Sequence, residues 1–236
     1  MQSFSARLSD VRRQIAEAAA KAGRSTDEIT LLAVSKTHPP EAVHEAIAAG
    51  QCLFGENRVQ EARAKIPGCP ANARWHLIGH LQKNKIRQAL PLFELIHSVD
   101  SLELAQDIDR IAKEEGRQPR ILLEVNVAGE ESKFGFSPVQ LQESMASLLS
   151  LEGLQIEGLM AIPPFADDPE ASRPYFVALR KLREQLRKRF QVPLPELSMG
   201  MSHDFPVAIE TGATIVRVGT ALFGERVGKT WKPGNT

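Results

Sequence analysis

Residues 31–40 read Leu31-Leu32-Ala33-Val34-Ser35-Lys36-Thr37-His38-Pro39-Pro40, with four apolar residues shortly before a lysine and two prolines after it. A short apolar run bounded by breakers is typical of a buried strand, which we expect over residues 31–36. Lys36 then lies at the carboxyl end of the strand, where a sheet opens into its loops. Such a lysine either forms an ion pair or reaches water, or it is a partly desolvated amine that forms a Schiff base. Most lysines are solvated and do no chemistry, so this strand alone favours the first interpretation.

The rest of the chain repeats this strand pattern in alternation with helical patterns. Apolar runs recur near residues 31, 52, 75, 95, 121, 156, 197 and 214. Eight strand–helix units in 236 residues predict an α/β fold with a single closed (β/α)8 barrel of the TIM type, rather than an open sheet. An additional N-terminal helix is expected at residues 4–22. We expect residues 1–228 to form this one domain and residues 229–236 to be a flexible tail.

The charge balance gives no sign of a nucleic-acid partner, because 29 lysines and arginines match 29 aspartates and glutamates. The densest basic run, residues 180–189, contains leucines at helical spacing and is expected to be the solvated face of a helix. Cys52 and Cys69 form no CxxC pair, so they offer no metal site and fit a reducing compartment. Without a signal-peptide pattern or an apolar run of about 20 residues, we expect a cytoplasmic protein with no membrane partner.

Polar residues collect where the predicted strands end, which is the catalytic face of such barrels. Besides Lys36 and Arg217, Asn57, His80 and Asn126 end strands two, three and five. After strand seven, Met201 is followed by Ser202, which begins a helix predicted over residues 202–210, so its hydroxyl and the first backbone N–H groups would face an anion. After strand eight, Gly219 allows close backbone approach and Thr220 adds a hydroxyl. Each feature alone is a helix cap or a turn, but together they favour a phosphate site.

A reactive lysine opposite a phosphate site fits two chemistries. One is pyridoxal 5'-phosphate (PLP), whose aldehyde meets the lysine, and the other is a lysine-dependent aldolase acting on a phosphorylated sugar. Arg217 bears on the choice, because it lies two residues before Gly219 and points to the same side of the strand. Next to a pyridine nitrogen it would keep that nitrogen unprotonated, since adjacent cations repel. An ion pair with Glu210 or another carboxylate is the alternative, so the residues alone leave both chemistries open.

Five motifs in order resemble the YggS/PROSC family of pyridoxal phosphate homeostasis proteins, and the likeness covers nearly the whole chain. The motifs are Ala33-Val34-Ser35-Lys36, Phe54-Gly55-Glu56-Asn57-Arg58-Val59-Gln60-Glu61, Trp75-His76-Leu77-Ile78-Gly79-His80-Leu81-Gln82-Lys83-Asn84-Lys85, Leu197-Ser198-Met199-Gly200-Met201-Ser202 and Val216-Arg217-Val218-Gly219-Thr220-Ala221-Leu222-Phe223-Gly224. The resemblance implies a barrel like the N-terminal domain of alanine racemase. It also implies intracellular vitamin B6 homeostasis by a monomer, with PLP-dependent apo-enzymes as partners.

The same resemblance assigns roles to the strand-end residues. It implies that Lys36 holds PLP as an internal aldimine and that Arg217 faces the pyridine nitrogen. Asn57 would line the ring pocket, although it could instead cap the next helix. His203 departs from the acidic or small residue that the family leads us to expect, which affects the helical turn predicted after strand seven. The residues implied to hold the phosphate are Met201, Ser202, Gly219 and Thr220.

The sequence favours a carrier over an enzyme. Racemisation needs a base on each face of the substrate α-carbon, and Lys36 serves one face. The resemblance implies that alanine racemase takes the second base, a tyrosine, from a second domain. The single tyrosine here, Tyr175, is predicted on the helix after strand six, away from the pocket. We therefore expect no enzymatic turnover. The alternative is a PLP-dependent amino-acid racemase or related α-carbon enzyme, with His80 or His38 as the second base.

Overall fold

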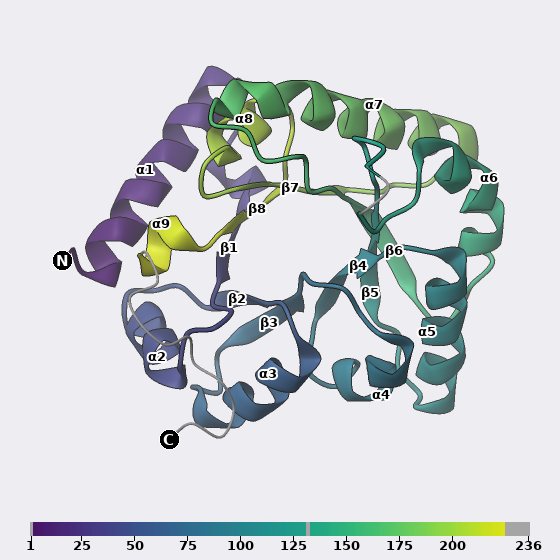
Figure 1. Cartoon of the computed structure of the whole chain (residues 1–236), viewed down its shortest axis with the longest axis horizontal. Helices are drawn as coiled ribbons and strands as arrows, with labels where there is room; N and C mark the ends of the chain where they lie inside the picture. The colour runs from purple at the N-terminus through teal and green to yellow at the C-terminus, as the bar shows by residue number, and fades with distance from the viewer. Residues whose placement is uncertain (1, 131–132, 225–236) are drawn as a thin grey trace.

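Residues 2–130 and 133–224 are described by the computed structural model of the chain, and within them eight parallel strands close a barrel (Figure 1). Each strand pairs with the next, and β8 pairs with β1 to complete the ring. The predicted barrel is therefore confirmed, whereas the expected domain end at 228 and the tail at 229–236 lie outside the described residues. The strands are β1 Thr30–Val34, β2 Leu53–Glu56, β3 Arg74–Leu77, β4 Leu95–Val99, β5 Arg120–Glu124, β6 Gln155–Met160, β7 Glu196–Met201 and β8 Ile215–Val218.

Helices surround the strands on the outside (Figure 1). The expected N-terminal helix is present as α1, which packs against α8 and α9. No helix in the described ranges combines the length and the apolar character needed to cross a bilayer. The helices are α1 Phe4–Lys21, α2 Pro40–Ala48, α3 Val59–Lys65, α4 Ile86–Ala89, α5 Leu102–Glu114, α6 Pro138–Leu149, α7 Arg173–Phe190, α8 Phe205–Glu210 and α9 Thr220–Phe223.

Two apolar layers hold the barrel together. Side chains alternate along each strand between the barrel interior and the layer beneath the helices. Because both faces of the sheet are buried, the strands are mostly apolar, and this pattern marks them in the sequence. The larger cluster packs the outer face of the sheet against the helices. The smaller one fills the interior and consists of Leu32, Val34, Ile78, Leu95, Leu122, Met160 and Ile215.

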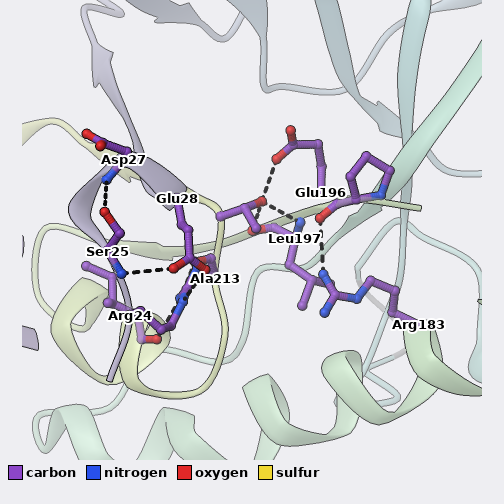
Figure 2. Close-up of polar contacts among 11 residues, drawn as sticks. Arg24, Ser25, Asp27, Glu28, Arg183, Glu196, Leu197 and Ala213 are labelled. Atoms are coloured by element: carbon purple, nitrogen blue, oxygen red, sulfur yellow. Dashed lines mark hydrogen bonds and ion pairs between the residues drawn. The ribbon is translucent and has the colours of Figure 1, made fainter. Parts of the chain in front are cut away.

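Polar contacts at the amino ends of the strands fix the chain where β1 meets β8 (Figure 2). Arg24, in the connection between α1 and β1, donates from Nη1 to the carbonyl oxygens of Ile209 at 3.0 Å and Ala213 at 2.8 Å. A capping box joins Ser25 and Glu28 in the same connection. These contacts tie the start of β1 to the segment that leads into β8, at the end of the barrel opposite the polar strand ends.

Two predicted elements differ from the structure near the candidate site. The first strand stops two residues before Lys36, which therefore lies in a turn. The helix predicted from Ser202 begins three residues later, at Phe205. The reason is a turn in which the Asp204 carboxylate accepts the N–H of Met201 at 2.7 Å, so that the backbone of residues 202–204 is not helical.

Candidate functional site

The mouth of the barrel contains a cavity of about 330 Å³ at the carboxyl ends of the strands. Continuing the inward-facing positions past the strand ends in steps of two leads from β2 to Asn57, from β3 through Ile78 to His80, and from β5 to Asn126. All three line this cavity, together with Glu124. The structure thus brings together polar residues that are far apart in the sequence.

Lys36 lies half-buried in the turn after β1. The strand ladder continues one residue past β1, because the Ser35 N–H donates to the Gly55 carbonyl at 3.1 Å. Thr37 then adopts a φ of +68°, in the left-handed region that β-branched residues rarely occupy. The Thr37 hydroxyl is buried and has no hydrogen-bond partner among the described residues. Lys36 is therefore flanked by a residue of the extended ladder and by a strained one.

A buried cluster of Glu56, Glu61 and Lys65, here called the Lys65 cluster, holds this turn from both sides. The fully buried Lys65 Nζ donates to Glu56 Oε1 at 2.7 Å, to Glu61 Oε1 at 3.1 Å and to the Ser35 carbonyl at 2.9 Å. The Ser35 hydroxyl donates to Glu56 Oε1 at 2.7 Å, and the Thr37 N–H donates to Glu61 Oε1. Burial raises the pKa of Glu56 although the Lys65 ammonium opposes that shift. No pattern in the sequence marks this cluster.

Arg217 is buried inside the barrel and bonded to neutral groups. Its Nη1 donates to Ser198 Oγ at 2.7 Å, and its Nη2 donates to the Ala161 carbonyl at 2.9 Å. The ion pair with Glu210 that the sequence left open does not form, because that carboxylate pairs with cations of α1 and α7. Burial lowers the pKa of Arg217 to about 10, so the guanidinium stays charged at neutral pH.

Two histidines continue the hydrogen-bonded chain from Arg217 and Ser198 across the barrel interior. Nδ1 of His97 lies 2.8 Å from Ser198 Oγ, and its Nε2 lies 3.0 Å from Nδ1 of His76. Because an arginine only donates, Ser198 Oγ accepts from Arg217 and can give its own proton to His97. Burial lowers the pKa of His76 to about 4 and holds that of His97 well below its ordinary value. Both imidazoles are neutral at neutral pH, and Arg217 is oriented by an uncharged chain.

The turns after β7 and β8 meet, but not through the predicted helix cap. Ser202 Oγ accepts the N–H groups of Gly219 at 3.0 Å and Ala221 at 3.3 Å. These two donors, at the amino end of α9, converge on one oxygen, as backbone donors do at an anion site. Met201 is the last residue of β7, and the exposed Thr220 is the first residue of α9. The predicted phosphate residues are therefore neighbours in the structure.

Asn57 is packed closely against Gly79. A Cβ atom at position 79 would lie 2.2 Å from the Asn57 carbonyl oxygen and 2.7 Å from Asn57 Cγ, so only glycine fits there. The alternative role as a helix cap does not apply, because α3 begins at Val59 and Arg58 occupies its N-cap position without a side-chain bond. Asn57 is thus held in the lining of the cavity.

Other ionisable groups complete the mouth. The Nδ1 atom of His80 lies 3.0 Å from Asp100 Oδ2, and its ring stacks on Phe134 with centroids 4.0 Å apart. Burial, and then the Asp100 charge, raises the pKa of Glu124 to about 7. His203, where the family pattern led us to expect another residue, is exposed and bonds to a backbone carbonyl of the loop before α7.

Comparison with known proteins places the chain in a family. Residues 7–227 match the family described as alanine racemase, N-terminal domain. The pyridoxal phosphate homeostasis protein of Aquifex aeolicus is 48% identical over 221 residues, which are 93% of this chain and 97% of that protein. The chain belongs to the pyridoxal phosphate homeostasis protein family. The Escherichia coli member is 41% identical over 224 residues, 93% of this chain and 95% of its own. The resemblance seen in the five motifs is confirmed.

Solved structures agree with this family. PipY of Synechococcus elongatus with PLP bound has a TM-score of 0.82 and 41% identity, and the match covers 94% of this chain and all (100%) of PipY. An alanine racemase of Clostridium difficile has a TM-score of 0.71, with 94% of this chain and 61% of that chain covered. Its identity of 18% shows a shared fold alone, which confirms the predicted barrel type of this chain.

Proposed function

We propose that this chain binds PLP through Lys36 and acts in intracellular vitamin B6 homeostasis, in the cytoplasm. The observation that carries the proposal is the PLP-bound structure of PipY, which is 41% identical and matches 94% of this chain. Curated relatives from Aquifex aeolicus and Escherichia coli, matched over nearly their full length, bear the name pyridoxal phosphate homeostasis protein.

The residues at and near the carboxyl ends of the strands fit the three functional groups of PLP. Lys36 offers a primary amine for the aldehyde, and Arg217 is a buried cation for the pyridine nitrogen. The Gly219 and Ala221 N–H groups already converge on one oxygen, as they would on the phosphate. The orphaned Thr37 hydroxyl fits a site that a ligand completes. We assign cofactor binding to Lys36, Asn57, Met201, Ser202, Arg217, Gly219 and Thr220.

The chain's own groups suit reversible holding of the cofactor. When bound, the aldehyde of PLP supplies an electrophile for a primary amine. Arg217 remains protonated, and a cation beside a pyridine nitrogen keeps that nitrogen unprotonated, because adjacent positive charges repel. Holding and release need no base on the second face of a substrate. We therefore propose a monomeric carrier that delivers PLP to PLP-dependent apo-enzymes without turnover of its own.

Borohydride labelling tests the proposal directly. Protein mixed with PLP is expected to turn yellow, to bleach on borohydride reduction, and to carry the reduced label on Lys36 in peptide mass spectra. Lys36→Ala is expected to lose this label. Lys83→Ala is the matched control, because Lys83 lies at the surface in an ion pair with Glu103. Wild-type protein that carries no label at Lys36 would overturn the proposal.

One observation favours the enzymatic alternative, an amino-acid racemase or related α-carbon enzyme. Asp100 orients the His80 imidazole at the cavity, an arrangement that general bases use. The other candidates are placed less well: the His38 ring stacks on Phe223, with centroids 4.8 Å apart, and Tyr175 lies on the outer helix α7. Steady exchange of amino-acid α-protons in deuterated buffer, lost in both Lys36→Ala and His80→Ala, would establish the enzyme. If no exchange occurs, the enzymatic alternative is contradicted and the carrier function is retained.

A further inference from the structure

The Lys65 cluster is costly in a way that barrel stability does not explain. The side chains of Lys65 and Glu56 are fully buried, and that of Glu61 is 10% exposed. Charges removed from water lose hydration that their mutual attraction repays only in part. Apolar side chains of similar volume are often as stabilising or more so, so a buried ion-pair cluster is weak evidence of a stabilising role. We therefore infer its role from the hydrogen bonds that these charged side chains make to neighbouring residues.

The hydrogen bonds of the Lys65 cluster reach Ser35 and Thr37, the two residues on either side of Lys36. Before it, the Ser35 carbonyl accepts from Lys65 Nζ at 2.9 Å, and the Ser35 hydroxyl donates to Glu56 at 2.7 Å. After it, the Thr37 N–H donates to Glu61 Oε1. The cluster therefore fixes the backbone of Lys36 from both sides, through side chains that come from the rigid elements β2 and α3.

The conformation of Thr37 shows why such support is needed. A threonine at a φ of +68° is strained, and strained backbone persists only where the surroundings over-determine it. The bond from the Thr37 N–H to Glu61 is a local contact that fixes this peptide unit. Glu61 is in turn held by Lys65, one helical turn further along α3. Without this bond, the turn would relax toward an extended or right-handed conformation and the Cα of Lys36 would move.

We propose that Glu61 and Lys65 are positioning residues for Lys36, holding its turn so that the amine meets an aldehyde in the mouth of the barrel. The inference rests on the proposed function of Lys36. Neither residue is assigned a contact with the cofactor. A displacement of about 1 Å between reacting groups can slow a reaction up to about 100-fold, so the turn geometry should set the rate of adduct formation at Lys36.

The chain contains a matched control for Glu61. The side chain of Asp109 on α5 is 11% exposed, close to the 10% of Glu61, and it accepts a backbone N–H, that of Gly153, at 2.6 Å. It also pairs with a lysine four residues later, Lys113, at 2.9 Å. Asp109→Ala therefore removes the same kind of buried carboxylate clamp as Glu61→Ala, but from a loop at the start of β6 rather than from the Lys36 turn.

The test compares the rate constant of PLP labelling at Lys36, trapped with borohydride, among variants held well below their unfolding temperatures. Glu61→Ala and Lys65→Met are expected to label at least about tenfold more slowly. Glu61→Gln is expected to label close to the wild-type rate, because its amide oxygen still accepts the Thr37 N–H. Asp109→Ala is expected to lose stability but to label at the wild-type rate. As a readout without cofactor, amide exchange at residues 36–37 should accelerate in Glu61→Ala and not in Asp109→Ala.

The outcomes separate this inference from the proposed function. If wild-type protein carries no label at Lys36, the proposed function fails. If wild-type protein is labelled and Glu61→Ala is labelled equally fast, Glu61 does not position Lys36 and the inference is overturned. If Glu61→Ala does not fold, Lys65→Met replaces it, because it removes the ammonium that holds both Glu61 and the Ser35 carbonyl. That variant is expected to label slowly, and a wild-type rate in it would also overturn the inference.

Discussion

Arg217 owes its orientation to uncharged partners rather than to a carboxylate. Ser198 Oγ and the Ala161 carbonyl occupy two of its donors, and the neutral His97 lies behind Ser198. A carboxylate paired to the guanidinium would cancel its charge inside the barrel. With neutral partners, the charge of Arg217 remains available to a ligand in the mouth, and this suits the proposed contact with the pyridine nitrogen.

Arg217→Gln is expected to weaken PLP binding about tenfold or more while the fold is kept. A hydrogen bond that involves a charged group contributes about 1.5–3 kcal/mol, and glutamine keeps a polar side chain while removing the charge. Absorbance titration with PLP measures the affinity, and circular dichroism checks the fold. Arg120→Gln is the control, because Arg120 begins β5 and bonds to Glu157 at 2.7 Å. Unchanged affinity in Arg217→Gln would remove Arg217 from the site.

At the scale of the elements, the strands could be predicted and the contacts between their ends could not. Apolar runs bounded by prolines and glycines marked the strands, and the barrel rule then placed Lys36 and Arg217 near the mouth. The spacing of Glu61 and Lys65 gave no warning of burial, because the same four-residue spacing is usual on exposed helix faces. Likewise, Ser202 resembled a helix cap, and only the tertiary structure shows it holding the turn after β8.

The turn between β7 and α8, which carries Ser202, depends on Gly200. Its φ is +89°, and a Cβ there would lie 2.5 Å from Ala208 Cβ. Gly50 has a similar φ of +86° with nothing within 4 Å, so Gly50→Ala measures the backbone cost alone, about 1–2 kcal/mol of unfolding free energy. Gly200→Ala is expected to lower the free energy of unfolding by about 1–3 kcal/mol more than Gly50→Ala does, because its Cβ also overpacks against Ala208. Equal losses in urea denaturation of the two variants would contradict this account of the turn.

At the scale of the whole molecule, the barrel interior encloses ionisable groups whose neutral forms the fold favours. Burial lowers the pKa of His76 to about 4, and burial raises that of Glu124 to about 7. Neutral groups avoid the cost of burying charge in the barrel interior, and for Glu124 this cost outweighs the attraction of the Arg217 guanidinium. The two groups depart from their unfolded pKa values in opposite directions, so they link the stability of the barrel to pH with opposite signs.

Urea denaturation between pH 4.5 and 7.5 is expected to separate these two contributions. An unfolded histidine binds a proton below about pH 6.5, whereas native His76 stays neutral down to about pH 4, so its contribution to stability is lost as pH falls. An unfolded glutamate releases its proton near pH 4.3, whereas native Glu124 keeps it up to about pH 7, so that contribution is lost as pH rises. Relative to wild type, His76→Gln should therefore gain stability as pH falls through this range, and Glu124→Gln should gain it as pH rises. Parallel pH dependences of the two variants would show that the interior does not favour the neutral forms.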